Sequence, residues 1–103
     1  EKEEKGMKGI FVSYNQAYNE EIVELLESFG QRGFTRWEDV EGRGSFEGEP
    51  HMGNHAWPTM NHALITFVPD DKAPAIMQAL REKDGSNQAL GLRAYCWTIE
   101  MFY

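Results

Sequence analysis

Clustered basic residues, long apolar runs and paired cysteines are all missing from this 103-residue sequence. Ten Lys and Arg stand against 17 Asp and Glu, and the formal net charge of −7 disfavours nucleic acid as a partner, because phosphate binding depends on clustered cations. No apolar run approaches the roughly 20 residues that span a bilayer, so no direct membrane insertion is expected. Cys96 is the only cysteine and has no second thiol for a disulfide within the chain. These absences favour a cytoplasmic protein.

Catalytic motifs are missing as well. The sequence contains no Ser-x-x-Lys, no nucleophile elbow and no His-Glu-x-x-His. Cys96 lies inside an apolar run, which indicates a small buried core residue and not a nucleophile. Asp70 and Asp71 are adjacent carboxylates, but they precede a predicted helix and are explained as caps. We therefore expect that the protein is not an enzyme.

Apolar periodicity predicts four strands. Short apolar or alternating runs, bounded by turn residues, place them at residues 7–14, 34–40, 60–68 and 92–103. The first six residues are polar and aperiodic, so 1–6 are expected to be a flexible leader or an expression remnant. Residues 7–103 then form a single domain, the size that one hydrophobic core supports.

Two helices are expected between these strands. The first has apolar residues at helical spacing from Ile22 to Phe29, with Asn19 as its N-cap and Gly30 as part of its stop signal. The second is capped by Asp70 or Asp71 and tolerates a proline in its first turn. Its predicted apolar face comprises Ala75, Ile76, Ala79 and Leu80, and it closes at residues 83–85.

The predicted order of elements is strand, helix, strand, long loop, strand, helix, strand. This order is that of an α+β ferredoxin-like fold, βαββαβ, in which two helices cover one face of a four-stranded antiparallel sheet. Aromatic residues on strand faces that the helices do not reach suggest that subunits bury their sheets against one another. Oligomerisation is therefore a structural prediction.

The stretch from residue 42 to residue 62 carries all three histidines: His51 and His55 in the loop between the second and third strands, and His62 at the start of the third strand. Imidazole suits zinc, copper and nickel, so these residues are candidate ligands of a transition metal ion. Gly53 and Pro58 disfavour a helix that would place His51 and His55 on one face. Histidines that cap turns or face water explain the same residues, and both interpretations stay open.

An anion site is a second hypothesis for this loop. Glycines on either side of Arg43 allow backbone N–H groups to point inward, and the guanidinium adds positive charge, so Arg43 and Gly44 are candidate contacts for an anionic ligand. The glutamates that surround them oppose a polyphosphate unless a cation intervenes. Their simpler interpretation is a charged, solvated loop.

The element order and the stretch GEPHMGNHAWPTMNHALITFV, residues 48–68, resemble divergent members of the nitrogen regulatory protein PII superfamily. The resemblance implies a homotrimer with a mobile T-loop between strands two and three, and a regulated partner such as a membrane transporter. In PII proteins a basic, glycine-containing turn before the last strand holds nucleotide phosphates. The corresponding stretch here, DGSNQALGLRAYCW, departs from that pattern, with Arg93 as its one basic residue, and Arg93 is a further candidate contact for an anionic ligand. An adenine nucleotide is the ligand of this kind that the resemblance implies.

The function that these features predict is a PII-like regulatory or sensor protein. A small ligand or metal ion would bind at subunit clefts near residues 42–61, order this loop and change the surface offered to a partner protein. One alternative is a metal-binding or metal-tolerance protein that uses the loop histidines. Another is a small ferredoxin-like enzyme or dimeric stress protein with a pocket at the sheet interface.

Overall fold

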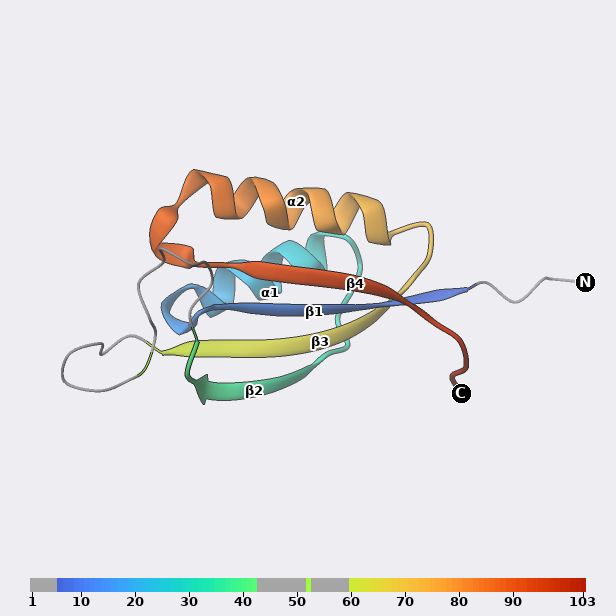
Figure 1. The fold of residues 1–103 in the computed structure, drawn as a ribbon. Helices are drawn as coiled ribbons and strands as arrows, with labels where there is room; N and C mark the ends of the chain where they lie inside the picture. The colour runs from blue at the N-terminus through green and yellow to red at the C-terminus, as the bar shows by residue number, and fades with distance from the viewer. Residues whose placement is uncertain (1–5, 43–51, 53–59) are drawn as a thin grey trace, which may run out of the picture.

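The computed structural model describes residues 6–42, 52 and 60–103 (Figure 1). Its elements follow the predicted βαββαβ order, with a short 3₁₀ helix after the first strand and another before the last. The elements are β1 (Met7–Asn15), η1 (Gln16–Tyr18), α1 (Asn19–Ser28), β2 (Thr35–Val40), β3 (Asn61–Pro69), α2 (Ala73–Ser86), η2 (Gln88–Leu90) and β4 (Arg93–Ile99). Of the expected leader, only Gly6 is described, and its carbonyl accepts the Asp70 N–H at 3.1 Å.

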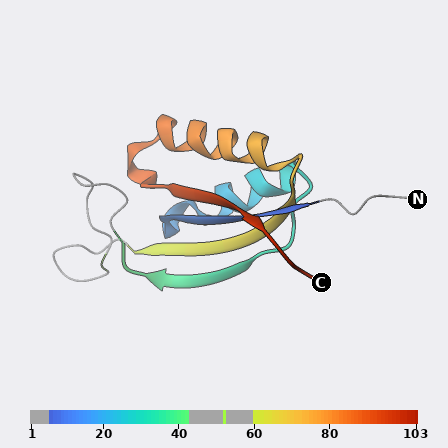
Figure 2. The same ribbon diagram turned by 45° about the vertical axis from the view of Figure 1, so that its right-hand side comes forward.

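The four strands form one antiparallel sheet in the order β2-β3-β1-β4. Both helices pack on the same side of this sheet, as the two ribbon views show (Figures 1 and 2). β1 lies in the centre and pairs with β3 on one side and β4 on the other, so β2 and β4 are the two edges. The predicted ferredoxin-like fold is confirmed.

The hydrophobic core lies between the helices and one face of the sheet. Strand alternation explains its composition, because every second residue of β1 and β3 faces the helices. Ile10 pairs with Thr66 and Val12 with Leu64, and all four side chains are fully buried. The helices and the lead-in to β4 contribute the rest, namely Ile22, Leu26, Ala73, Ile76, Leu80, Leu90 and Leu92.

The opposite face of the sheet carries aromatic side chains that no described element covers. The exposed fraction is 41% for Trp97, 47% for Phe67, 49% for Trp37 and 58% for Tyr95. Trp97 lies over the backbone of Gly9, where an added Cβ would come within 2.7 Å of the indole. An exposed group of large aromatic residues of this kind is typical of a surface that another molecule buries.

Both helices begin differently from the prediction. Asn19 is the first residue of α1 and not its N-cap, because Asn15 caps the preceding η1 turn and the Asn19 side chain accepts the Tyr14 hydroxyl instead. Lys72, without a side-chain cap bond, precedes α2, so the predicted capping by Asp70 or Asp71 is wrong. Gly30 ends α1 as predicted, with a φ of +79° that suits glycine.

β4 differs from the prediction in length and in burial. It ends at Ile99, four residues before the predicted end of the strand. Cys96 is exposed, which corrects the prediction of a buried core residue. The reason is topological, because β4 is an edge strand and the helices leave its outer part uncovered.

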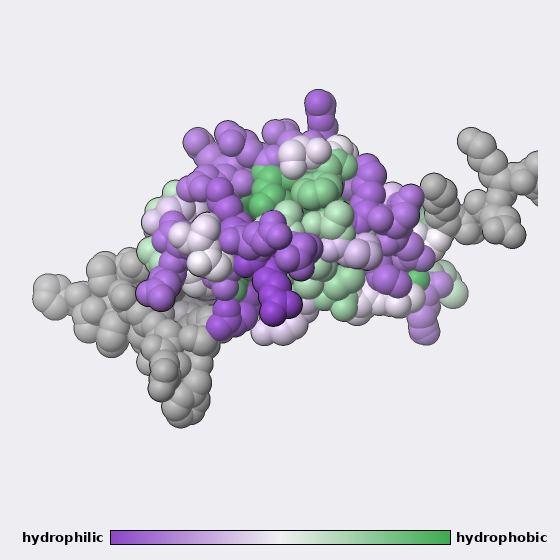
Figure 3. Space-filling model, turned by 90° about the horizontal axis from the view of Figure 1, so that it is seen from above, coloured by the Kyte–Doolittle hydropathy of each residue, from purple (hydrophilic) through white to green (hydrophobic). Residues whose placement is uncertain are grey.

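Seen from the helix side, the surface is mainly hydrophilic around a central apolar patch (Figure 3). α1 carries four exposed acidic residues, Glu20, Glu21, Glu24 and Glu27. In the part of the chain that the structure describes, no helix has the length and apolar content needed to cross a bilayer.

Candidate functional site

The base of the long loop is held by the end of β2 and the start of β3. The Asp39 N–H donates to His62 Nδ1 at 3.3 Å, and His62 Nε2 lies 4.0 Å from a Glu38 carboxylate oxygen. Asp39 adopts a left-handed φ of 55° where the pairing of β2 with β3 shifts register between Trp37 and Val40. His62 therefore has a structural contact on one nitrogen, which leaves Nε2 as the atom directed toward Glu38.

The other loop candidates fall outside the described residues. Arg43, Gly44, His51 and His55 lie in ranges 43–51 and 53–59, so the metal and loop-anion hypotheses stay predictions. Within the described residues, no group of three or more His, Cys, Asp or Glu side chains is arranged to hold a metal ion. His62 with Glu38 is a pair only.

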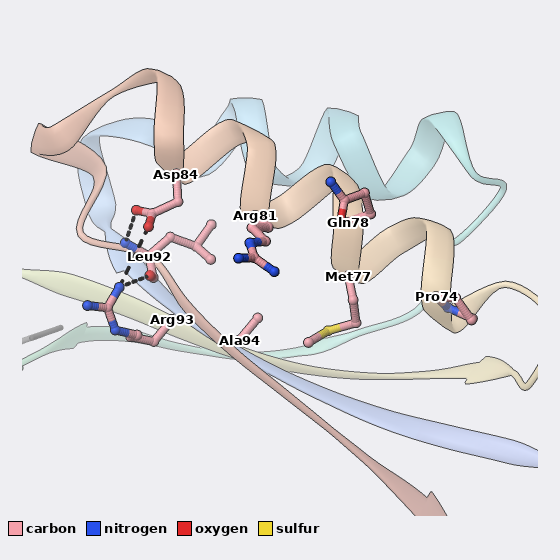
Figure 4. Close-up of a pocket in the computed structure, with 8 residues that line it drawn as sticks. All are labelled: Pro74, Met77, Gln78, Arg81, Asp84, Leu92, Arg93 and Ala94. Atoms are coloured by element: carbon pink, nitrogen blue, oxygen red, sulfur yellow. Dashed lines mark hydrogen bonds and ion pairs between the residues drawn. The ribbon is translucent and has the colours of Figure 1, made fainter.

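The remaining candidate, Arg93, lines a pocket between α2 and β4 (Figure 4). The pocket has a volume of about 360 Å³, within the range of small-molecule sites. Its helical wall comes from residues spaced three and four apart, which places them on one stripe of α2. The full lining is Pro74, Met77, Gln78, Arg81, Asp84, Leu92, Arg93 and Ala94.

The pocket has an apolar part and a charged end. Met77 and Ala94 point toward each other across the space between helix and strand, while Asp84 and Arg93 meet at the end near η2 (Figure 4). Arg93 Nη1 lies 3.6 Å from one Asp84 carboxylate oxygen and donates to the Leu92 carbonyl at 2.8 Å. The other Asp84 oxygen accepts the Leu92 N–H at 3.0 Å.

Arg81 supplies the second positive charge of the pocket. It lies one helical turn before Asp84, and its guanidinium points into the space between α2 and β4 (Figure 4). The side chain is exposed. Together with the apolar wall, two guanidinium groups suit a ligand that has an anionic group on a flat or apolar body.

The charged end of this pocket and the base of the long loop lie at the same end of the sheet. Asn15, the last residue of β1, donates through its side-chain amide to the Ala89 carbonyl of η2 at 3.0 Å. The next residue, Gln16, donates its backbone N–H to the Met60 carbonyl at the base of the loop, also at 3.0 Å. The end of β1 thus connects the segment before β4 to the loop base.

Sequence reasoning identified Arg93 but missed Arg81. The signal was present, because Met77, Gln78, Arg81 and Asp84 share a stripe of α2 next to the buried one. Whether these residues line a pocket depends on where β4 begins relative to that stripe, and the periodicity of the sequence does not show this.

No family model and no curated protein matches this sequence. Solved structures do match it in fold. A PII-like signalling protein from Thermus thermophilus is 22% identical, with a TM-score of 0.67 over 92% of this chain and 87% of that one. CPII, a nitrogen regulatory PII-like protein from Thiomonas intermedia bound to ADP, AMP and bicarbonate, is 14% identical, with a TM-score of 0.69 over 93% and 90% of the two chains.

A third match extends the fold beyond proteins of described function. A functionally unknown protein from Pediococcus pentosaceus is 6% identical, with a TM-score of 0.66 over 97% of this chain and 98% of that one. In each case nearly the whole of both chains is superposed. The chain therefore has the fold of the PII-like signalling proteins, as its element order and residues 48–68 suggested.

Proposed function

We propose that this protein is a PII-like regulatory protein, without enzymatic activity of its own, that binds an adenine nucleotide in the pocket between α2 and β4. The observation that carries the proposal is the pairing of two arginines with an apolar wall in that pocket. A nucleotide combines a flat base with an anionic phosphate, and the pocket offers a counterpart to each. CPII, which shares the fold, is bound to ADP and AMP.

In this proposal the phosphate contacts Arg81 and Arg93, and the base lies against Met77 and Ala94. Because β4 is an edge strand, a neighbouring subunit beside it would turn the pocket into a subunit cleft. The exposed aromatic face of the sheet gives the reason for such a neighbour, since a homotrimer would remove Trp37, Phe67 and Tyr95 from water.

Signalling would follow from the position of the pocket. A ligand at Arg93 lies at the end of the sheet where Asn15 and Gln16 connect η2 to the loop base. Binding would favour one arrangement of residues 42–61 and so change the surface available to a partner, with couplings of about 1–3 kcal/mol. A membrane transporter is one partner class that the resemblance suggests, and a cytoplasmic location stays a prediction.

The metal-binding alternative has less support among the described residues. The Nδ1 atom of His62 accepts the Asp39 N–H, so a metal on Nε2 would require the ring to lose its remaining proton or the hydrogen bond to break. His62 serves the loop base in this arrangement. A metal site would then depend on His51 and His55.

Calorimetric titration with AMP, ADP and ATP tests the proposal. The wild type and the variants Arg81→Gln, Arg93→Gln and Arg32→Gln should be compared. Arg32 is exposed between α1 and β2 and does not line the pocket, so it controls for the loss of one positive charge. Each pocket variant should weaken binding by about 10- to 100-fold, as expected for a charge-assisted hydrogen bond, and Arg32→Gln should not. Absence of binding to the wild type, or equal losses in all three variants, would overturn the proposal.

A further inference from the structure

Asp84 makes two contacts in the pocket that a purely cationic binding site would not need. One carboxylate oxygen accepts the Leu92 N–H at 3.0 Å, and the other faces Arg93 Nη1 at 3.6 Å. The first contact fixes the segment that leads into β4. The second places a negative charge beside the guanidinium that a ligand phosphate would approach.

The balance of charge in the pocket follows from its lining. Arg81, Arg93 and Asp84 are its three charged residues, and they leave one net positive charge. Along α2, Arg81 lies between Met77 and Asp84 (Figure 4). A nucleotide with its base at Met77 and its first phosphate between the two arginines would direct its further phosphates toward Asp84. A second or third phosphate would therefore meet a carboxylate, and like charges at close range oppose binding.

We infer that Asp84 determines ligand specificity and makes the pocket selective for a nucleoside monophosphate over a triphosphate. This inference rests on the proposed function and names the ligand class within it. Asp84 does not hold the ligand. It limits the number of anionic groups that Arg81 and Arg93 accept, and it keeps Arg93 in place through Leu92 when no ligand is bound.

The variant Asp84→Asn separates the charge of this residue from its structural contact. An amide oxygen still accepts the Leu92 N–H, while the negative charge is lost. Glu82→Gln is the matched control, because it changes the net charge equally on the same helix and Glu82 does not line the pocket. Glu82 accepts a hydrogen bond from the pocket residue Gln78 at 3.1 Å, and the amide oxygen of the variant can still accept it. Melting temperatures of both variants establish that each is folded before binding is compared.

The measurement is the ratio of the AMP and ATP dissociation constants, by calorimetry in chelator at constant ionic strength. The wild type should bind AMP more tightly than ATP. Asp84→Asn should shift the ratio toward ATP by about tenfold or more, and Glu82→Gln should leave it unchanged. An unchanged ratio in Asp84→Asn, or equal shifts in the two variants, would overturn the inference while the nucleotide proposal stands.

Inorganic phosphate and tripolyphosphate keep the inference testable if nucleotides do not bind. Their effect on the melting temperature should be recorded for the wild type, Asp84→Asn and Glu82→Gln. Stabilisation of Asp84→Asn alone by tripolyphosphate would support the role of Asp84 and overturn the nucleotide proposal. No stabilisation of any variant by either anion, together with no nucleotide binding, would overturn both.

Discussion

The buried hydroxyl of Tyr14 donates to the side-chain oxygen of Asn19 at 2.5 Å, which connects the end of β1 to the first residue of α1. Tyr14 has no exposed surface. Burial raises the pKa of the Tyr14 phenol to about 12, although the positive charge of Arg36 acts in the opposite direction. The folded chain thus keeps this phenol neutral at pH values where the unfolded chain ionises it.

Stability should fall as the pH rises from about 10 to about 12 because of Tyr14. In that window the unfolded state has lost the phenol proton and the folded state still holds it, so raising the pH favours unfolding. The contribution is fully present below pH 10 and amounts to roughly 2–3 kcal/mol at most. Urea unfolding at several pH values measures it.

Tyr14→Phe tests the assignment. The variant loses the hydrogen bond to Asn19 and should be about 1 kcal/mol less stable at neutral pH. Its free energy of unfolding should then decline less than that of the wild type above pH 10. If both proteins lost stability equally in alkaline solution, Tyr14 would not be the group responsible.

Asp39 should tolerate glycine and resist valine. Its φ of 55° suits residues without a branched Cβ, so Asp39→Val should lower the free energy of unfolding by about 1–3 kcal/mol and Asp39→Gly should change it by less than about 1 kcal/mol. Glu41→Val is the control, because Glu41 carries the same charge without a positive φ. Denaturant unfolding provides the comparison, and equal effects of valine at both positions would contradict the role given to the Asp39 backbone.

A charge on the open sheet face should prevent assembly. Phe67 lies on that face with 47% of its surface exposed, so Phe67→Glu should leave the monomer folded but place a carboxylate in the proposed interface. Ala75→Glu adds the same charge on the exposed side of α2 and should assemble like the wild type. Light scattering gives the mass of each, and a Phe67→Glu protein that assembles to the same mass as the wild type would argue against burial of this face.

The fold was accessible from the sequence because its signals are local and repeat. Short apolar runs at residues 7–14 and 60–68 identified the two strands that became β1 and β3, and helical spacing up to Gly30 identified α1. The order of these elements then selected the ferredoxin-like arrangement. Residues 48–68 added the resemblance to PII-like proteins, which the structural matches confirm for the fold.

Details that depend on tertiary position were not accessible in the same way. Cys96 lies among apolar residues in the sequence, but it is exposed because β4 is an edge strand. The periodicity of the sequence does not show which strand forms an edge of the sheet. Asn19 was predicted as a cap because asparagine is common at helix starts, which is a property of the local sequence. In the structure its side chain accepts the Tyr14 hydroxyl instead, and this partner depends on how β1 and α1 pack together. Arg81 and Arg93 are twelve residues apart, and only the contact of α2 with β4 brings them into one pocket.

Native mass spectrometry with and without AMP tests the central claim most directly, because one spectrum reports both assembly and ligand number. A PII-like nucleotide sensor of the kind proposed should appear at three times the mass of one chain and should take up three AMP molecules per trimer. A monomer, or a trimer whose mass stays the same when AMP is added, would contradict the account.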